Sequence, residues 1–177
     1  MRIVGGNVLL RAIELSDSQM LHTIINDAET EHMLGGWSFP VSMSRQEEWI
    51  RALKEDPQVL RCMIDRREEG TPIGTIMLTK IDYKNGNAEL HIKLAAGSYR
   101  GQGYGSDAVK TIVKYAFDEL RLHVIYARVN EFNTASRTMF EKCEFEQEGI
   151  LKQRIYKQGR FHDVISYSIC NRNEGLS

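Results

Sequence analysis

A β-type run, a glycine-rich loop, a helical run and a second β-type run follow one another between residues 87 and 129. The β-type runs cover residues 87–94 and 124–129, and the amphipathic helical pattern begins at Tyr104. Two strands joined through a helix form a right-handed crossover, which makes them parallel in one sheet. This order therefore predicts a sheet of mixed strand direction with helices packed on it.

The rest of the chain adds antiparallel hairpins and short helices. The Asn-Gly pair at residues 85–86 is the strongest short-range hairpin signal. Ser16 with Gln19, and Ser44 with Glu47, have the form of capping boxes that open two helices. The remaining expected elements are strands at 7–13, 59–65, 72–81, 146–156 and 161–169, a helix at 134–142, a loop at 35–40 and hairpin turns at 68–70 and 158–159.

Length and composition exclude several classes of protein. The 177 residues suggest a single domain over 1–177. With 23 Lys and Arg against 24 Asp and Glu, the net charge of −1 lacks the basic excess of a nucleic-acid binder. No stretch approaches the roughly 18 apolar residues of a membrane span, and no apolar signal-peptide core begins the chain. We therefore expect a cytoplasmic location, with no nucleic-acid and no membrane partner.

Cysteine and histidine spacings indicate neither a disulfide framework nor a metal site. The three cysteines are far apart and form no C-x-x-C pair, which fits a reducing cytoplasm. The histidines show no metal-like spacing, so each is expected to be structural or exposed. The residues in question are Cys62, Cys143 and Cys170, and His32, His91, His123 and His162.

The glycine-rich loop is the first candidate binding site. Gly101, Gly103 and Gly105 expose backbone N–H groups just before a helix, whose positive dipole end favours phosphate oxygens. Arg100 adds a cation to the loop. The alternative to a phosphate site is a glycine-rich turn that merely joins the strand to the helix. Gly103, Gly105 and Ala108 also satisfy the looser dinucleotide pattern. A single crossover, with no acidic residue about 20 positions on at a strand end, argues against a nicotinamide enzyme.

Five motifs follow one another along nearly the whole chain. They are Leu10-Arg11 with Glu14 and Asp17; Ala88-Glu89-Leu90 with Leu94; Arg100-x-x-Gly103-x-Gly105; Asn133 and Ser136 with Met139 to Phe145; and Gly159-Arg160 to Asp163 with Tyr167. Together they resemble the GNAT N-acetyltransferases, in particular the ribosomal-protein and spermidine N-acetyltransferase-like members, and the third resembles their acetyl-CoA-binding motif. The resemblance implies a single α/β (α+β) GNAT fold, a mixed, mostly antiparallel twisted sheet of about seven strands flanked by about four helices.

The resemblance implies acetyl-CoA as co-substrate and no metal. In this family the strands on either side of the crossover helix diverge, and the pantetheine arm lies in the resulting V. Backbone groups of the first strand would then pair with pantetheine amides, as a strand edge can. Asn133 would reach the pantetheine from the facing side, or would only cap its helix. The expected cofactor-binding residues are Ile92, Lys93, Leu94, Arg100, Gly101, Gln102, Gly103, Tyr104, Gly105, Ser106, Asn133 and Phe140.

The implied reaction is direct transfer of an acetyl group to a primary amine. Glu89 is the expected base, acting through water, unless it only forms an ion pair. Backbone N–H near Leu94 would polarise the thioester carbonyl. Phe140 replaces a tyrosine that supplies the thiolate's proton in many relatives. Ser136 is the substitute donor, unless it is a surface hydroxyl and a solvent proton suffices.

Several alternatives stay open. The acceptor is either a protein or peptide N-terminus or a small amine, and the sequence does not decide whether the chain forms a homodimer. Trp37, Phe39 and Trp49 form either an acceptor wall or ordinary packing. The rival function, motivated by Phe140, is a CoA-binding regulatory module without catalysis. Glu144 stands where the family usually has glycine, at a cost of about 1 kcal/mol if that position is left-handed.

Overall fold

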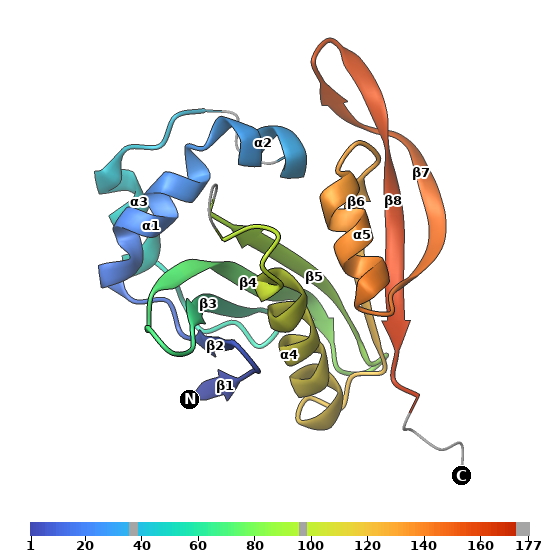
Figure 1. Cartoon of the computed structure of the whole chain (residues 1–177), viewed down its shortest axis with the longest axis horizontal. Coiled ribbons are helices and arrows are strands. Elements are labelled where there is room, and N and C mark those ends of the chain that lie inside the picture. Colours follow the sequence, from blue (N-terminus) through green and yellow to red (C-terminus); the bar gives the residue numbers. More distant parts are fainter. Residues whose placement is uncertain (36–38, 96–98, 173–177) are drawn as a thin grey trace.

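The chain folds into one eight-stranded mixed sheet with five α-helices, as seen in the computed structural model, which describes residues 1–35, 39–95 and 99–172 (Figure 1). The strand order is β1-β2-β3-β4-β5-β6-β8-β7. The strands are β1 (Arg2–Val4), β2 (Val8–Arg11), β3 (Leu60–Arg66), β4 (Pro72–Asp82), β5 (Asn87–Leu94), β6 (Val124–Asn130), β7 (Glu146–Lys157) and β8 (Arg160–Cys170). The helices are α1 (Ser18–Ile25), α2 (Ala28–Leu34), α3 (Met43–Arg51), α4 (Tyr104–Asp118) and α5 (Thr134–Lys142), with a 3₁₀ turn at Leu15–Asp17.

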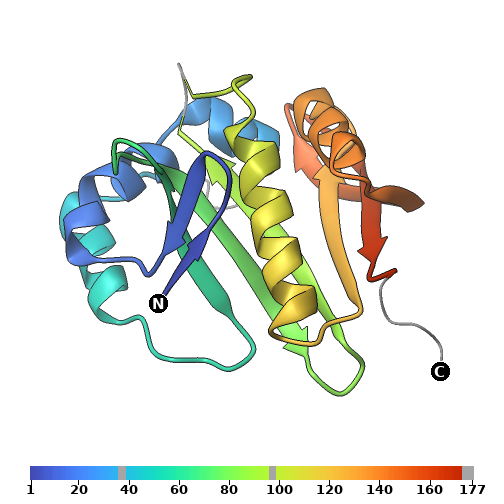
Figure 2. The ribbon, with the colours of Figure 1, turned by 60° about the horizontal axis from the view of Figure 1, so that its bottom comes forward.

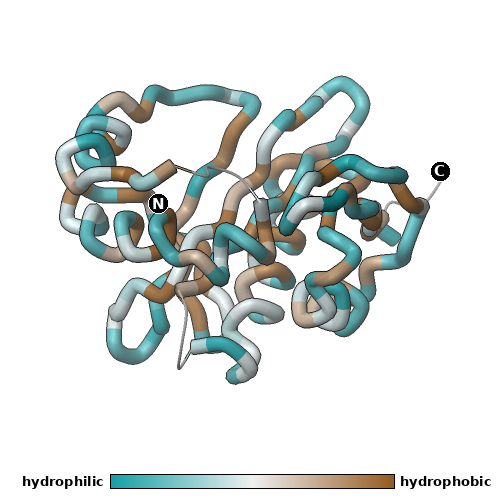
Figure 3. Tube along the Cα trace, turned by 90° about the horizontal axis from the view of Figure 1, so that it is seen from above, coloured by the Kyte–Doolittle hydropathy of each residue, from teal (hydrophilic) through white to brown (hydrophobic). Residues whose placement is uncertain are grey.

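Helices cover both faces of the sheet. The apolar stripe of α4 packs with Ile76 and Leu78 of β4 and Ala88 of β5, all fully buried, and Phe140 of α5 joins this cluster. On the opposite face, Leu21 of α1 packs with α3 and β3 in a smaller cluster. Figure 3 shows the apolar segments along the inner elements and hydrophilic segments on the outer loops. None of the helices within the described residues is long and apolar enough to cross a membrane.

The sheet divides where β5 meets β6. These strands are parallel, as the crossover predicted, but they pair only from Asn87 with Val124 to Glu89 with Tyr126. Beyond Glu89 the two strands diverge into a V, with α4 lying across one face (Figure 2). Because β6 keeps pairing with β8 as far as Asn130, the divergence leaves two facing strand edges without partners in this sheet.

The structure corrects the sequence prediction at four places. Eight strands and five helices replace about seven and about four, because β1 and α2 are too short for a periodic pattern to identify them. The 3₁₀ turn before α1 has its capping box at Glu14 and Asp17, not at Ser16 and Gln19. The cap of α3 is Ser42, whose side chain accepts from Arg45 N–H, rather than Ser44.

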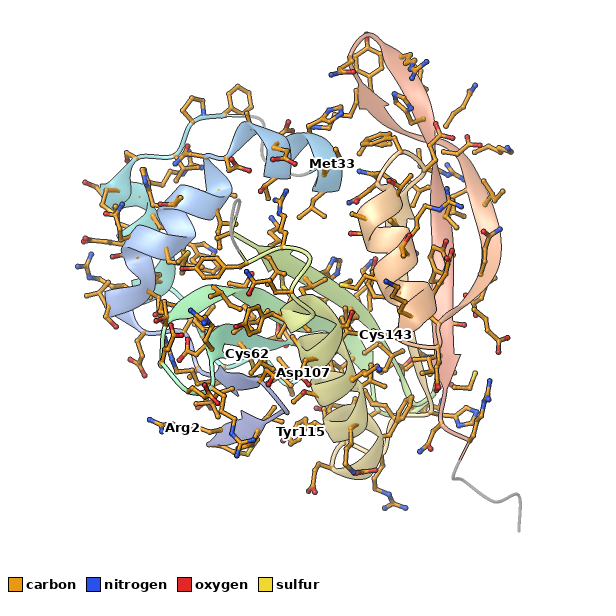
Figure 4. All side chains as sticks on the ribbon, in the orientation of Figure 1. Arg2, Met33, Cys62, Asp107, Tyr115 and Cys143 are labelled. Atoms are coloured by element: carbon orange, nitrogen blue, oxygen red, sulfur yellow. The ribbon has the colours of Figure 1, made fainter. Side chains whose placement is uncertain are left out.

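One carboxylate joins α4 to the N-terminal hairpin. Asp107, in the first turn of α4, accepts backbone N–H bonds from Gly6 at 3.2 Å, Asn7 at 2.6 Å and Val8 at 3.0 Å. Figure 4 labels this side chain beside β1 and β2. The turn between the two strands has no other strand to satisfy these donors, so the first turn of α4 supplies the acceptor.

The end of α5 is a Schellman motif with a strained residue. Glu144 adopts φ +67°, and its N–H donates to Glu141 O at 3.0 Å while Phe145 N–H donates to Phe140 O at 3.0 Å. The rings of Phe140 and Phe145 pack with centroids 5.0 Å apart, the apolar contact that accompanies this motif. Glu144 therefore occupies a left-handed C′ position, the condition under which the sequence predicted a cost.

We expect Glu144→Gly to stabilise the protein by about 1 kcal/mol, because glycine adopts this φ without steric strain. For a domain near this size, that raises the melting temperature (Tm) by roughly 2–4 °C. Glu144→Ala is the matched control, since it also removes the charge but keeps the strain. Equal Tm values for the glycine and alanine variants would contradict the assignment of strain to this position.

Candidate functional site

A cleft of about 470 Å³ lies between the two arms of the V. On one side it is bounded by β5 and the glycine-rich loop, on the other by the start of α5, and α2 lies across its opening. The predicted site residues that line it are Ile92, Leu94, Arg100, Gly101, Gly103, Gly105, Ser106, Asn133 and Ser136. The fold thus gathers residues from β5, the loop, α4 and α5 around one space.

The glycine loop at the open end needs its glycines for two reasons. Gly101 has φ +77° and Gly103, the N-cap residue of α4, has φ +87°, which only glycine adopts without strain. A Cβ at either would meet no atom of the described residues within 4 Å, which leaves open space beside both glycines in that part of the chain. A Cβ at Gly105 would lie 3.0 Å from Met139 Sδ, so this glycine lets α4 and α5 approach closely.

Arg100 lies in the cleft but is held by α2. Its guanidinium donates to Glu29 Oε1 at 2.9 Å and to Thr30 Oγ1 at 3.0 Å. The cation predicted for the loop is therefore present, paired to an exposed carboxylate. Such an exposed pair is weak, so a phosphate group can replace Glu29 at small cost.

Helix α2 also contacts the other arm of the V. Asn130 and Asn133 donate their side-chain amides to Met33 O, at 2.9 and 3.2 Å. Figure 4 labels Met33 at the end of α2 that lies near α5. Asn133 Oδ1 also accepts from Ser136 N–H at 3.1 Å, so its predicted role as a helix cap is confirmed. The same side chain lines the cleft, which keeps ligand contact as a second role to test.

Four of the predicted cofactor residues, Lys93 among them, do not have their side chains in the cleft. Tyr104 turns its hydroxyl to Arg66, whose Nε donates to it at 3.0 Å, and Gln102 is also absent from the cleft wall. Phe140 is 3% exposed and packs in the core against Phe145 and Tyr167. The ring of Phe140 fills the space between α5 and the sheet. A phenyl ring performs this packing role without the hydroxyl of a tyrosine.

Glu89 lies at the base of the V, on the face opposite the cleft. Its neighbours Ala88 and Leu90 point into the core under α4, so alternation along β5 turns Glu89 to the other side. The carboxylate is 4% exposed; Lys80 Nζ donates to Oε2 at 2.6 Å, and Arg128 lies 3.8 Å from Oε1. The predicted ion pair is therefore present, and a role as base remains a prediction.

His91 is a candidate that the sequence alone did not single out. It follows Glu89 on the same face of β5, just past the last β5–β6 pair. Its Nε2 lies 3.0 Å from Thr79 Oγ1, and burial lowers its pKa. A mostly neutral imidazole at the point where the strands separate is suited to accept a proton. The signal that could have identified it is the two-residue spacing from Glu89.

A second cavity of about 390 Å³ lies on this opposite face, between the strands β3 to β5 and the helices α1 and α3. Its wall includes Trp49, one of the three aromatic residues predicted for an acceptor pocket. Phe39 is 68% exposed and lies outside it, and Trp37 lies outside the described residues. Lys93 directs its side chain into this second cavity, while Ile92 and Leu94 face the cleft.

The thiol nearest the cleft is not suited to nucleophilic catalysis. Cys143 is 4% exposed, and its Sγ lies 3.6 Å from Ser106 O. Burial raises the pKa of this thiol, so the reactive thiolate is disfavoured. No group of three metal-ligating side chains occurs within residues 1–35, 39–95 and 99–172.

Comparisons with known proteins identify the family. The sequence model described as Acetyltransferase (GNAT) domain matches residues 7–146. The chain is 32% identical over 165 residues to the N-acetyltransferase p20 of Bacillus licheniformis, covering 92% of each. It is 27% identical over 163 residues to spermidine N(1)-acetyltransferase of Vibrio cholerae, covering 91% of each. A crystal structure of the Vibrio cholerae spermidine N-acetyltransferase with CoA and spermine superposes with a TM-score of 0.84, at 26% identity, over 93% of this chain and 95% of that one.

The chain therefore belongs to the GNAT acetyltransferase family. It is an acetyl-CoA-dependent N-acetyltransferase that acts on an amine. This assignment removes the dinucleotide alternative for the glycine loop, and it agrees with the fold class that the sequence predicted.

Proposed function

We propose that acetyl-CoA binds in the cleft between β5 and β6, and that the acceptor amine approaches from the second cavity on the opposite face. The observation that carries this proposal is the pair of unpaired strand edges beyond Glu89, with a positive-φ glycine turn at their open end. Strand edges supply N–H and C=O groups for the pantetheine amides. The turn and the start of α4 supply N–H groups for the pyrophosphate.

The residues of the cleft fit this ligand. The backbone N–H groups of residues 102–106 face the pyrophosphate, and Arg100 exchanges Glu29 for a phosphate oxygen. Backbone groups of Ile92, Lys93 and Leu94 hold the pantetheine on one side, and Asn133 faces it from the other arm. The space beside Gly101 and Gly103, which a Cβ would enter, is what lets a phosphate approach the backbone.

The chemistry divides between the two faces. Acetyl-CoA supplies an activated acyl group as a thioester. Glu89, positioned by Lys80, accepts the amine proton through a water, and His91 is the second candidate for this step. Backbone N–H near Leu94 polarises the thioester carbonyl. Ser136, whose side chain lines the cleft, donates a proton to the departing sulfur.

The first experiment is a thermal-shift panel with acetyl-CoA, CoA, NADH, NADPH and ATP. A ligand at 100 times its Kd stabilises the folded state by about 2.7 kcal/mol, which raises Tm by roughly 5–10 °C for a domain near this size. We expect a shift with acetyl-CoA and CoA, followed by acceptor-dependent release of thiol. CoA binding without thiol release for any amine would favour the regulatory module instead.

Gly103→Ala should weaken CoA binding about tenfold, because alanine resists φ +87° and its Cβ enters the cleft. Gly159→Ala is the matched control: Gly159 has φ +80°, and a Cβ there would meet no described atom within 4 Å, but it lies at the β7–β8 turn. Both variants carry similar strain, and titration calorimetry should show weaker CoA binding only for the first. Equal CoA affinities for the two variants would show that the phosphate groups of CoA do not bind at this loop.

We further propose that the chain works as one domain over residues 1–177 in the cytoplasm. Its partners are acetyl-CoA and an amine acceptor, either a small molecule or a peptide N-terminus, with no nucleic-acid and no membrane partner. The three free cysteines support a reducing compartment. A homodimer stays a prediction, to be read from sedimentation of the purified protein.

A further inference from the structure

The second cavity has an unusual charge distribution. Three cations line it: Arg45 from α3, Arg61 from β3 and Lys93 from β5. Among the described residues, no aspartate or glutamate lines this cavity. The rest of its wall is mostly apolar, with Ile13, Leu21, Ile24, Met77 and Trp49.

Two of these cations have no partner within the described part of the chain. Neither Arg61 nor Lys93 makes a side-chain hydrogen bond or ion pair there. Burial lowers the pKa of Lys93, with no carboxylate near enough to oppose the effect. A half-buried ammonium group without a counter-ion is unfavourable. An anion bound in the cavity would supply the missing negative charge.

The sheet register places both cations on the face of the sheet that carries His91, with Lys93 on β5 itself and Arg61 two strands away on β3. Arg61 pairs with Met77, which pairs with His91, and Lys93 pairs with Thr75 in the next row of the same face. Because side chains two residues apart share a face, His91 and Lys93 are neighbours about 7 Å apart along β5. One small molecule can therefore span from the opening of the V to these cations.

We propose that the acceptor is a small amine that also carries a carboxylate on an aliphatic or aromatic body, as an amino acid does. The inference rests on the proposed function and names the acceptor class for it. The carboxylate binds Arg61 and Lys93, the apolar body packs on the wall around Trp49, and the amine faces the V. The volume of about 390 Å³ lies in the range of small-molecule sites.

The same charges disfavour a polyamine. Spermidine carries several positive charges, which three cations would repel and no cavity carboxylate would hold. Like-charge repulsion excludes such a partner even where the fold is shared. The acceptor class therefore separates this chain from the spermidine N-acetyltransferase of Vibrio cholerae, to which its structure is similar.

The test compares each amino acid with its own amide. Thiol release from acetyl-CoA is measured with leucine, leucinamide, phenylalanine, phenylalaninamide and spermidine, in wild type and variants. Arg61→Gln should lower kcat/KM for leucine by about 10- to 100-fold, since hydrogen bonds to charged groups contribute that much. For leucinamide the same variant should change kcat/KM less than about threefold. Each ratio compares one acceptor in two proteins, so differences in amine basicity cancel.

Two further variants guard against a folding artefact. Lys93→Gln should reproduce the selective loss for leucine, and Arg61→Glu should reverse the preference towards leucinamide. Arg51→Gln is the matched control, because Arg51 is a cation of α3 that pairs with Glu47 outside the cavity. Its kcat/KM values should equal those of wild type, and Tm of every variant confirms that the protein folds.

The outcomes separate the inference from the function on which it rests. A preference for the amino acids that Arg61→Gln abolishes supports the inference. Acetylation of the amides or of spermidine as well as, or better than, the amino acids overturns the acceptor class and leaves the acetyltransferase intact. Binding of CoA with no thiol release for any amine overturns the proposed function, and the acceptor class with it.

Discussion

Glu89→Gln should lower kcat by about 100-fold or more while leaving the affinity for CoA unchanged. The expected loss follows from removing a proton acceptor, which contributes roughly 10²–10⁴ to a rate. CoA affinity is expected to stay because the Glu89 side chain points away from the cleft, on the face that carries His91 and Lys93. Steady-state kinetics with a saturating acceptor, together with calorimetry for CoA, measures both quantities.

The control must separate catalysis from the loss of an ion pair in which the carboxylate is buried and the lysine is exposed. Asp163→Asn removes another strand carboxylate, which Lys152 holds at 2.7 Å, outside both cavities. Its kcat should equal that of wild type. If Glu89→Gln lowers Tm but leaves kcat unchanged, Glu89 is only an ion-pair partner of Lys80. His91→Gln then becomes the variant that tests the second candidate base.

Asp17→Asn should destabilise the protein by about 3 kcal/mol at neutral pH, the largest stability effect that we expect. Asp17 is 3% exposed, and both of its oxygens accept from the Arg11 guanidinium at 2.8 Å. Arg11 also donates to Asp65 at 2.6 Å, so one cation joins the start of α1 to β2 and β3. Replacing Asp17 breaks a largely buried charge pair and leaves Asp65 as the remaining counter-charge of Arg11. Urea denaturation gives the free energy of unfolding.

The same pair predicts how stability depends on pH. Burial opposes ionisation of Asp17, but hydrogen bonds from Arg11 and Glu14 N–H outweigh it and lower its pKa below the ordinary 3.8. A carboxyl whose pKa is lower in the folded state contributes stability that is complete above about pH 4. This contribution is lost as pH falls through the folded-state pKa. The difference between wild type and Asp17→Asn should therefore shrink below about pH 4.

Glu47→Gln provides the matched control for this prediction. Glu47 also pairs with an arginine, Arg51 at 3.0 Å, but the Arg51 side chain is 57% exposed and that of Glu47 35%. The variant should therefore change the free energy of unfolding by less than about 1 kcal/mol. A difference between wild type and Asp17→Asn that persists unchanged at pH 2 would contradict the role of Asp17 ionisation.

The sequence predicted the long periodic elements well and the short ones poorly. The bounds predicted for β5 and α5 are confirmed, and α4 begins at Tyr104 as expected, because each has a strong periodic pattern between clear turns. The predicted cap of α3 is wrong because Ser42 and Ser44 both offer a hydroxyl three residues before a partner. The choice between them depends on which helix face packs inward, and here Gln46 and Ile50 are buried.

The two cavities differ in how much of their lining could be predicted from the sequence. The cleft includes one contiguous loop whose spacing resembles a family motif, so nine of its 19 described lining residues were predicted. The second cavity combines Arg45, Arg61 and Lys93 from three separate segments. Only the strand register and the packing of α3 bring these three residues together, and neither can be predicted from the local sequence.

Helix α2 gives the cleft a shape that does not depend on a ligand. It contacts the loop arm through the hydrogen bond from Arg100 to Thr30 and the opposite arm through Asn130 and Asn133, while His32 stacks on Phe132 with ring centroids 5.0 Å apart. Because α2 contacts both arms of the V, it holds them at a fixed separation. The entropy of ordering the site is then lost during folding rather than during each encounter with the cofactor, so affinity is gained through preorganisation.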